Sequence, residues 1–188
     1  AQETGALFAR AARIAAESEL GFGTALSREV AAAGPANPEL SILCLAAEAN
    51  LPVTVHVAIG TDTVHMHPDC DGGHVGTATH RDFLRLASLV AGLDGGAYVN
   101  VGSAVVLPEV FMKAVAIAHN PAGREGDAAA RAERIRITTG NLDMLRHYRP
   151  RVNVLERPAV TGYEITGQHE MTVPLLRLAI ITAAGVTS

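Results

Sequence analysis

Hydrophobic positions in the first quarter of the chain recur at helical spacing. Over residues 3–20 an apolar side chain returns every three or four positions, which is typical of an amphipathic helix. A second helix is expected over 24–33 and a third over 38–50, where Asn37 supplies an N-cap and Pro38 a favourable first helical residue. Four residues of the third helix are expected to be buried: Leu40, Leu43, Cys44 and Ala47.

The pattern then changes to short apolar runs between polar loops. Residues 53–59 (Val-Thr-Val-His-Val-Ala-Ile) are rich in β-branched side chains and end at Gly60, as expected of a buried strand. Further strands are expected at 97–101, 136–139 and 151–155, and further helices at 79–91, 108–119 and 171–184. Strands that alternate with helices predict an α/β fold with a parallel sheet. We expect one domain over residues 1–188, with 120–134 a mobile excursion.

Composition narrows the classes of function. The 188 residues are 48% hydrophobic and carry a formal net charge of -4, so no excess of basic residues points to nucleic acid. No apolar stretch reaches the roughly 18 residues that span a bilayer, and we expect no membrane association. The two cysteines, Cys44 and Cys70, do not suggest a disulfide framework, which favours a cytoplasmic location.

The densest polar cluster follows the first expected strand. Its sequence, His-Met-His-Pro-Asp-Cys-Asp-Gly-Gly-His, is similar to the His-x-His-x-Asp-His loop of the metallo-β-lactamase family, with Cys70 in place of the third His. Imidazole and carboxylate groups are common Zn or Mn ligands, so one interpretation is a metal-dependent hydrolase. The other is that these side chains cap and hydrogen-bond the turn. The candidate metal ligands are His65, His67, Asp69, Asp71 and His74.

A second group of candidates follows the strand expected at 97–101. Gly102 and Ser103 connect it to an apolar helix, either as a phosphate cradle or as a tight turn. Asn100 and Glu109 are expected at the same edge of the sheet. Lys113, the only lysine, lies four residues after Glu109 and predicts either a Schiff-base nucleophile or an ordinary ion pair.

Two more segments carry polar chemistry. The basic run 146–151 (Arg-His-Tyr-Arg-Pro-Arg) predicts either an anion site with bidentate arginines or a subunit contact. His169 and Glu170 precede the last expected helix, where they are candidates for an acid–base group or for helix capping.

Several segments, taken in order, resemble the deoxyhypusine synthase family. Gly60-Thr61-Asp62 is similar to that family's Thr-Asp-Gly turn, and Gly102-Ser103-Ala104-Val105-Val106 to its Gly-Gly-Gly-Val-Val turn. Residues 37–57 resemble its helix leading into a strand, 152–154 its later strand, and 173–176 its terminal Phe-Pro-Leu-Leu helix. The resemblance covers roughly residues 37–182 and implies a Rossmann-like, three-layer NAD-binding domain in a homo-oligomer, a dimer or tetramer.

The resemblance also implies a chemistry, an NAD-linked transferase or oxidoreductase acting on a small amine or polar substrate. The expected cofactor-binding residues are Gly60, Thr61, Asp62, Asn100, Gly102 and Ser103. The expected catalytic groups are His65, His67, Asp69, Glu109 and His169. The chain is expected to be the C-terminal part of a longer family-type protein.

The chain departs from the family where the family carries out its chemistry. The glycine triplet is reduced to Gly102, and residues 156–167 contain no counterpart of the Trp-Gly-Lys segment that supplies the imine-forming lysine. Lys113 belongs to a different element and does not replace it. A non-catalytic ligand-binding or assembly module is therefore a further alternative.

Overall fold

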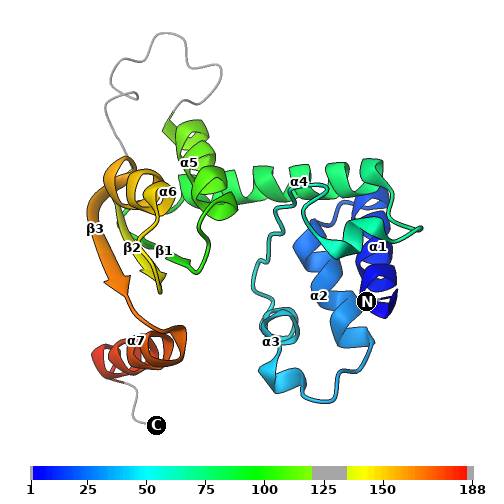
Figure 1. The fold of residues 1–188 in the computed structure, drawn as a ribbon, viewed down its shortest axis with the longest axis horizontal. Coiled ribbons are helices and arrows are strands. Elements are labelled where there is room, and N and C mark those ends of the chain that lie inside the picture. The colour runs from blue at the N-terminus through cyan, green and yellow to red at the C-terminus, as the bar shows by residue number, and fades with distance from the viewer. Residues whose placement is uncertain (1, 120–134, 186–188) are drawn as a thin grey trace. The chain divides into compact units, whose positions relative to one another are not determined.

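The structure, a computed structural model, describes residues 2–119 and 135–185. It divides into two compact units, Ala1–Ser88 and Leu89–Ser188, called here the N-terminal and C-terminal units (Figure 1). The single domain expected over residues 1–188 stays a prediction. The excursion expected at 120–134 lies outside the described residues. Of the helices in the described ranges, none is both long enough and apolar enough to cross a membrane.

The N-terminal unit is helical. Its elements are α1 (Gln2–Glu17), α2 (Phe22–Ala32), η1 (Pro38–Leu40), α3 (Ile42–Glu48), η2 (Thr63–Met66) and α4 (Gly72–Ala91), which crosses the boundary between the units. The helices expected over 3–20 and 24–33 are confirmed. The third is shorter than expected because the Ser41 side chain caps a new helix by accepting from the Cys44 N–H. Leu40 is 79% exposed, so its expected burial is wrong.

Small residues build the core of this unit. Alanines of α1, α2 and α4 surround the fully buried Phe22 and Val75. Gly23 lies where α2 comes very close to the backbone of Val53. A Cβ added to Gly23 would come within 2.2 Å of the Val53 carbonyl oxygen. Small side chains let these elements approach closely, and the core consists largely of their contacts.

Arg81 and Asp82, two neighbouring residues of α4, connect this helix to α1, α2 and residues 53–59. Arg81 donates to three backbone carbonyls at and beyond the C-terminal end of α1, one of them that of Leu20 at 3.0 Å. Asp82 is completely buried, and its Oδ2 accepts from the N–H groups of Gly23 (2.7 Å) and Val55 (2.8 Å). A cation at a helix C-terminus and an acid near a helix N-terminus both complement the helix dipole.

The strand expected at 53–59 is not formed. Val55 and Val57 pack against the helical core, and the described residues offer this segment no partner strand. Its backbone bonds to side chains of α4 instead: Thr79 Oγ1 accepts from the Val57 N–H (3.0 Å) and donates to the Val55 carbonyl (2.8 Å). The helix expected at 79–91 also starts earlier than expected, since α4 already begins at Gly72.

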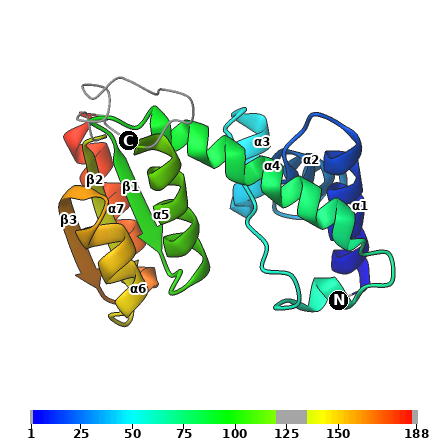
Figure 2. The same ribbon diagram turned by 90° about the horizontal axis from the view of Figure 1, so that it is seen from above.

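The C-terminal unit contains a parallel sheet (Figure 2). Its elements are β1 (Ala97–Val101), α5 (Val106–His119), β2 (Ile137–Asp143), α6 (Tyr148–Pro150), the π-helical segment η3 (Arg151–Glu156), β3 (Ala159–Thr166) and α7 (His169–Ala183). The strand order is β1-β2-β3, and both pairs are parallel. The expected α/β class with a parallel sheet is confirmed, as are the strand at 97–101 and the last helix.

The third strand lies later in the chain than expected. Residues 151–155 form η3 rather than a strand, and Val152, Asn153 and Val154 are buried in succession. Three consecutive buried side chains suit a helical segment wedged between neighbours, whereas a strand alternates them. Thr139 of β2 donates its hydroxyl to the Val154 carbonyl at 2.8 Å and so fixes η3 against the sheet.

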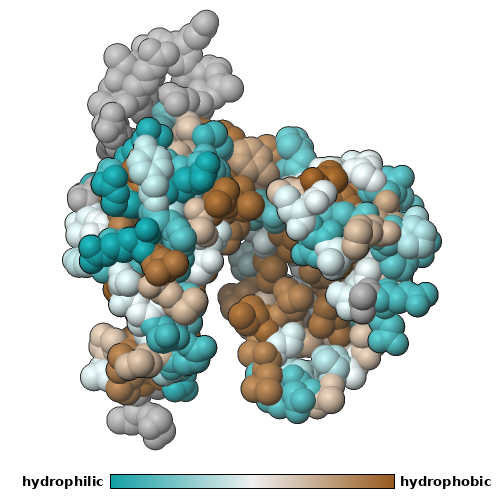
Figure 3. Space-filling model, viewed as in Figure 1, coloured by the Kyte–Doolittle hydropathy of each residue, from teal (hydrophilic) through white to brown (hydrophobic). Residues whose placement is uncertain are grey.

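The two faces of the sheet differ. One face packs against α5 and η3: the ring of Tyr98 stacks on Phe111 with centroids 3.6 Å apart, and a Cβ on Gly162 would lie 2.7 Å from the Leu155 carbonyl oxygen. The other face exposes apolar side chains of β1 and β3, namely Val99, Val101, Tyr163 and Ile165. Helix α7 has no buried residue, and hydrophobic side chains gather over it in the space-filling view (Figure 3).

Candidate functional site

A row of polar side chains crosses the sheet of the C-terminal unit near the carboxyl ends of its strands. The register aligns Asn100 of β1 with Asn141 of β2, and Asn141 with Glu164 of β3. Residues paired in a parallel sheet share a face, so the three side chains form one transverse row. Asn100 and Asn141 are each 1% exposed, and Asn100 Nδ2 donates to Asn141 Oδ1 at 2.7 Å.

This row and the start of α7 hold buried polar atoms that have no hydrogen-bond partner among the described residues. They are Asn100 Oδ1, Asn141 Nδ2, Glu164 Oε1, His169 Nδ1 and Thr172 Oγ1. Buried polar atoms are nearly always hydrogen-bonded in folded proteins, so each such atom calls for an explanation such as a ligand or a bound water. Their concentration at one sheet edge is the strongest sign of a binding site in this unit.

The turn after β1 brings a histidine to the same edge. Gly102 adopts a φ of 66°, in the left-handed region that favours glycine, and its N–H donates to the Leu142 carbonyl. A Cβ on Gly102 would lie 3.3 Å from His169 Nε2, so the ring occupies the space that glycine leaves open. Ser103 Oγ accepts from the Leu107 N–H at 3.2 Å, where α5 begins. The expected turn and the expected residue His169 therefore meet.

The aromatic side chains next to this row, Tyr98 and Phe111, carry no charge. Tyr98 occupies the same face two residues before Asn100, and burial against Phe111 raises the pKa of its phenol to about 12. The phenol is therefore neutral across the physiological range. An apolar base beneath polar side chains lowers the local dielectric and strengthens any hydrogen bond made there.

Glu109 belongs to a separate cluster in the same unit. Its carboxylate accepts from Asn153 Nδ2 at 2.9 Å and lies 3.7 Å from Lys113 Nζ and 3.5 Å from Arg149 Nε. Lys113 thus forms the ordinary i,i+4 ion pair that the sequence left open. The bond to Asn153 joins η3 to α5, and the pair with Arg149 joins α6 to α5. The expected catalytic part of Glu109 stays a prediction.

The arginines of the basic run are paired with acids. Arg146 Nε lies 3.4 Å from Glu164 Oε2, and Arg151 donates to Glu156. With Arg149 beside Glu109, each of the three guanidiniums has a carboxylate partner. These pairs give no support to the bidentate anion site expected from this run, and both that site and the subunit contact stay predictions.

The polar loop of the N-terminal unit folds on itself. His65 Nδ1 accepts from the N–H groups of Gly60 (3.1 Å) and Asp62 (3.3 Å), and Asp62 Oδ1 accepts from the Val64 N–H (3.3 Å). This is a capping box at the start of η2. Thr61 donates its hydroxyl to the backbone of Ala58. The expected part of Gly60, Thr61 and Asp62 in binding NAD stays a prediction.

The remaining loop candidates also bond locally. His67 Nδ1 accepts from the Asp69 N–H at 3.2 Å, and its ring packs against Gly5 of α1. Asp71 Oδ1 accepts from the His74 N–H at 2.8 Å, which begins α4 and lowers the pKa of the Asp71 carboxyl. Within residues 2–119 and 135–185, no group of three or more His, Cys, Asp or Glu side chains could hold a metal ion. The capping interpretation accounts for the loop, and the metal interpretation finds no support there.

Sequence reasoning missed two members of the transverse row, Asn141 and Glu164. A signal for β3 was present, because residues 160–165 (Val-Thr-Gly-Tyr-Glu-Ile) are rich in β-branched and aromatic side chains between Pro158 and Gly167. Asn141 follows the expected strand at 136–139, which in fact runs on to Asp143. The alignment of Asn141 and Glu164 with Asn100 became known only from the pairing of the three strands.

The chain was compared with known proteins at three levels. No protein-family model matches it, and no curated protein and no solved structure shows significant similarity. The resemblance to the deoxyhypusine synthase family therefore stays a prediction.

Proposed function

We propose that the C-terminal unit binds a dinucleotide such as NAD at the carboxyl edge of its parallel sheet. Asn100, Asn141 and Glu164 would hold polar groups of the ligand, and Gly102 and Ser103 would let it approach the turn after β1. The observation that carries the proposal is the concentration of unpartnered buried polar atoms at this edge. Parallel α/β sheets bind ligands outside the carboxyl ends of their strands.

The chemistry of the row suits a nucleotide better than a bare anion. An amide oxygen and a carboxylate oxygen accept hydrogen bonds, as ribose hydroxyls and a carboxamide NH2 require, and the free amide nitrogen donates. Glu164 Oε2 lies beside Arg146, which leaves Oε1 for a ligand hydroxyl. A site built from such groups fits the sugar and amide parts of NAD. It also fits the Rossmann-like, three-layer class that the resemblance implies.

His169 is the group that we assign to proton transfer. Its ring lies over Gly102, and Nδ1 has no partner among the described residues. NAD, when bound, supplies hydride acceptance, and a histidine at the edge of the cofactor site can take the proton that a hydroxyl or amine substrate releases. We therefore propose an NAD-linked oxidoreductase or transferase acting on a small amine or polar substrate.

Calorimetric titration with NAD, NADH and ADP-ribose tests the binding step. The key variant is Asn141→Leu, which keeps the branched shape and the number of side-chain heavy atoms and removes the polar atoms. We expect it to weaken binding about tenfold, the effect of losing one or two hydrogen bonds. Thr138→Val is the matched control, because Thr138 is exposed on the same strand and faces away from the row.

Failure of all three ligands to saturate the wild-type protein at millimolar concentration would refute the dinucleotide proposal. Equal losses in Asn141→Leu and Thr138→Val would show that binding lies elsewhere. His169→Gln separates binding from chemistry: we expect NAD affinity within about threefold of wild type, and loss of NADH formation from a panel of primary amines and alcohols.

A further inference from the structure

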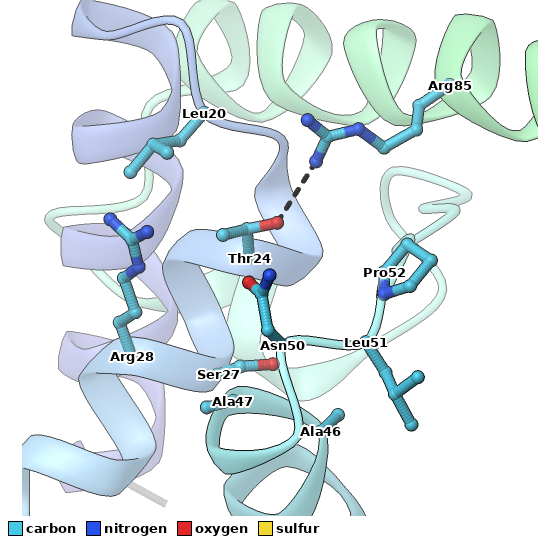
Figure 4. Close-up of a pocket in the computed structure, with 10 residues that line it drawn as sticks. All are labelled: Leu20, Thr24, Ser27, Arg28, Ala46, Ala47, Asn50, Leu51, Pro52 and Arg85. Carbon is cyan, nitrogen blue, oxygen red and sulfur yellow. Dashed lines mark hydrogen bonds between the residues drawn. The ribbon is translucent and has the colours of Figure 1, made fainter.

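The N-terminal unit contains a cavity between α2, α3 and α4 that the proposed function does not use (Figure 4). Its volume is about 390 Å³, within the range of small-molecule sites. The residues that line it are Leu20, Thr24, Ser27, Arg28, Ala46, Ala47, Asn50, Leu51, Pro52 and Arg85. Two of these residues are arginines and none is acidic, although the chain as a whole has a net charge of -4.

Neither arginine of this cavity forms an ion pair within the part of the chain that the structure describes. Arg28 makes no ion pair or hydrogen bond with any residue in the described ranges, and its neighbour Glu29 is paired with Arg10. Arg85 extends from α4 and donates to Thr24 Oγ1 at 3.1 Å, its one hydrogen bond to a described residue (Figure 4). Guanidinium groups keep several donors in a planar fork, so both arginines retain donors for an anion.

A buried hydroxyl adds a second, independent sign of a ligand. Ser27 is 3% exposed, and its Oγ has no hydrogen-bond partner in the described structure. A serine side chain inside a helix either points to solvent or bonds the carbonyl four residues earlier, and Ser27 does neither. Its oxygen lies on the cavity wall beside Asn50 (Figure 4). A ligand oxygen in the cavity would satisfy it.

The end of α3 contributes apolar side chains and the Asn50 amide to the cavity wall. The Asn50 N–H donates to Ala47 O and the Leu51 N–H to Ala46 O, a Schellman motif in which Asn50 takes the left-handed φ of 51°. This turn places Leu51 and Pro52 along the cavity. An occupant therefore meets guanidinium, hydroxyl and amide groups together with the alkyl groups of Leu20, Leu51 and Pro52.

We propose that this cavity is a binding site for a small organic anion, a carboxylate or phosphate monoester with a short apolar chain. Arg28, Arg85 and Ser27 hold the charged head, and Ala46, Leu51 and Pro52 contact the chain. The site is independent of the dinucleotide site, because it uses residues of the N-terminal unit alone.

Calorimetric titration with hexanoate, hexyl phosphate, inorganic phosphate and hexanol tests the proposal. Wild-type protein is expected to bind one of the two organic anions saturably and at least about tenfold more tightly than hexanol or inorganic phosphate. Arg28→Gln and Ser27→Ala are each expected to weaken that binding about tenfold. Ser27→Ala loses no protein hydrogen bond, so its melting temperature should not fall, which separates a lost ligand contact from a damaged fold.

Arg13→Gln is the matched control, because Arg13 is an exposed arginine that forms a surface pair with Glu17. The proposal is overturned if neither organic anion saturates the wild-type protein by about 10 mM, an affinity near the weak limit of specific binding. It is also overturned if hexanol binds equally well, or if Arg13→Gln weakens binding as much as Arg28→Gln does. Asn141→Leu should leave the binding of both anions unchanged, so failure here is distinguishable from failure of the dinucleotide site.

Discussion

Residues 53–59 and 97–101 are similar in sequence but differ in structure. Both runs are rich in valine, and both precede a glycine turn. Residues 97–101 form β1 and pair along their whole length with β2. Residues 53–59 have no partner strand among the described residues, and side chains of α4 receive or supply their hydrogen bonds.

The comparison shows two ways to satisfy a buried backbone. In β1 a neighbouring strand offers donors and acceptors at the spacing of the ladder. In 53–59 two side chains take the place of a neighbouring strand. Asp82 accepts from the Val55 N–H, and Thr79 accepts from the Val57 N–H. A ladder is supported by many equivalent bonds, whereas the second arrangement depends on two residues. Single substitutions should therefore affect the two regions differently.

The largest effect is expected where β1 packs against α5. Phe111 is fully buried and stacks on Tyr98, so Phe111→Ala removes a large side chain and leaves a cavity. We expect a loss of about 4 kcal/mol in the free energy of unfolding. Urea unfolding followed by circular dichroism measures it, with Ile117→Ala on the exposed side of α5 as control. Equal costs for both variants would contradict the assigned packing.

Asp82→Ala should have the next largest effect, this time on residues 53–59. It leaves the N–H groups of Gly23 and Val55 without their shared acceptor, at a cost of about 3 kcal/mol. Hydrogen exchange should show faster exchange at Val55. Asp69→Ala, an exposed carboxylate, is the control and should change stability by less than about 0.5 kcal/mol. Unchanged exchange at Val55 would mean that Asp82 does not hold this segment.

Thr79→Val tests the other side chain that bonds residues 53–59, and a smaller loss of stability is expected. The substitution keeps the shape and removes the hydroxyl that bridges Val55 and Val57, so we expect a loss of about 1.5 kcal/mol. Thr77→Val on the exposed side of α4 should be near neutral. A cost for Thr77→Val as large as that for Thr79→Val would assign the effect to the helix rather than to the bridge.

The smallest expected effect is a dependence on pH. Burial lowers the pKa of His56 below its ordinary value of 6.5, with the charge of Asp82 acting in the opposite direction. The unfolded chain therefore takes up a proton at a higher pH than the folded chain. The stability that neutral His56 contributes is complete above about pH 6.5 and is lost as the pH falls towards the folded pKa. Urea unfolding between pH 8 and 5 should show a shallower slope for His56→Gln, and identical slopes would refute this assignment.

The candidate site was only partly visible in the sequence. Asn100, Gly102, Ser103 and His169 were expected, and the structure places them at one sheet edge. Asn141 and Glu164 were not, because their importance depends on the register of strands separated by variable loops. Conversely, the cluster from His65 to His74 was dense in sequence, but its side chains bond locally. A high density of polar residues along the chain is a weak guide to a site, since turns use polar side chains to hydrogen-bond their own backbone.

The sequence by itself determined the helices at both ends of the chain, the strand at 97–101 and the parallel α/β class. These features follow from local periodicity and turn residues, which need no distant partner. Only the tertiary structure decided that residues 53–59 lie against α4, that 151–155 form η3 and that Asn100, Asn141 and Glu164 share a row. A β-branched run becomes a strand only when another strand supplies hydrogen bonds along its edge. Long-range packing, and not local propensity, decides whether that partner is present.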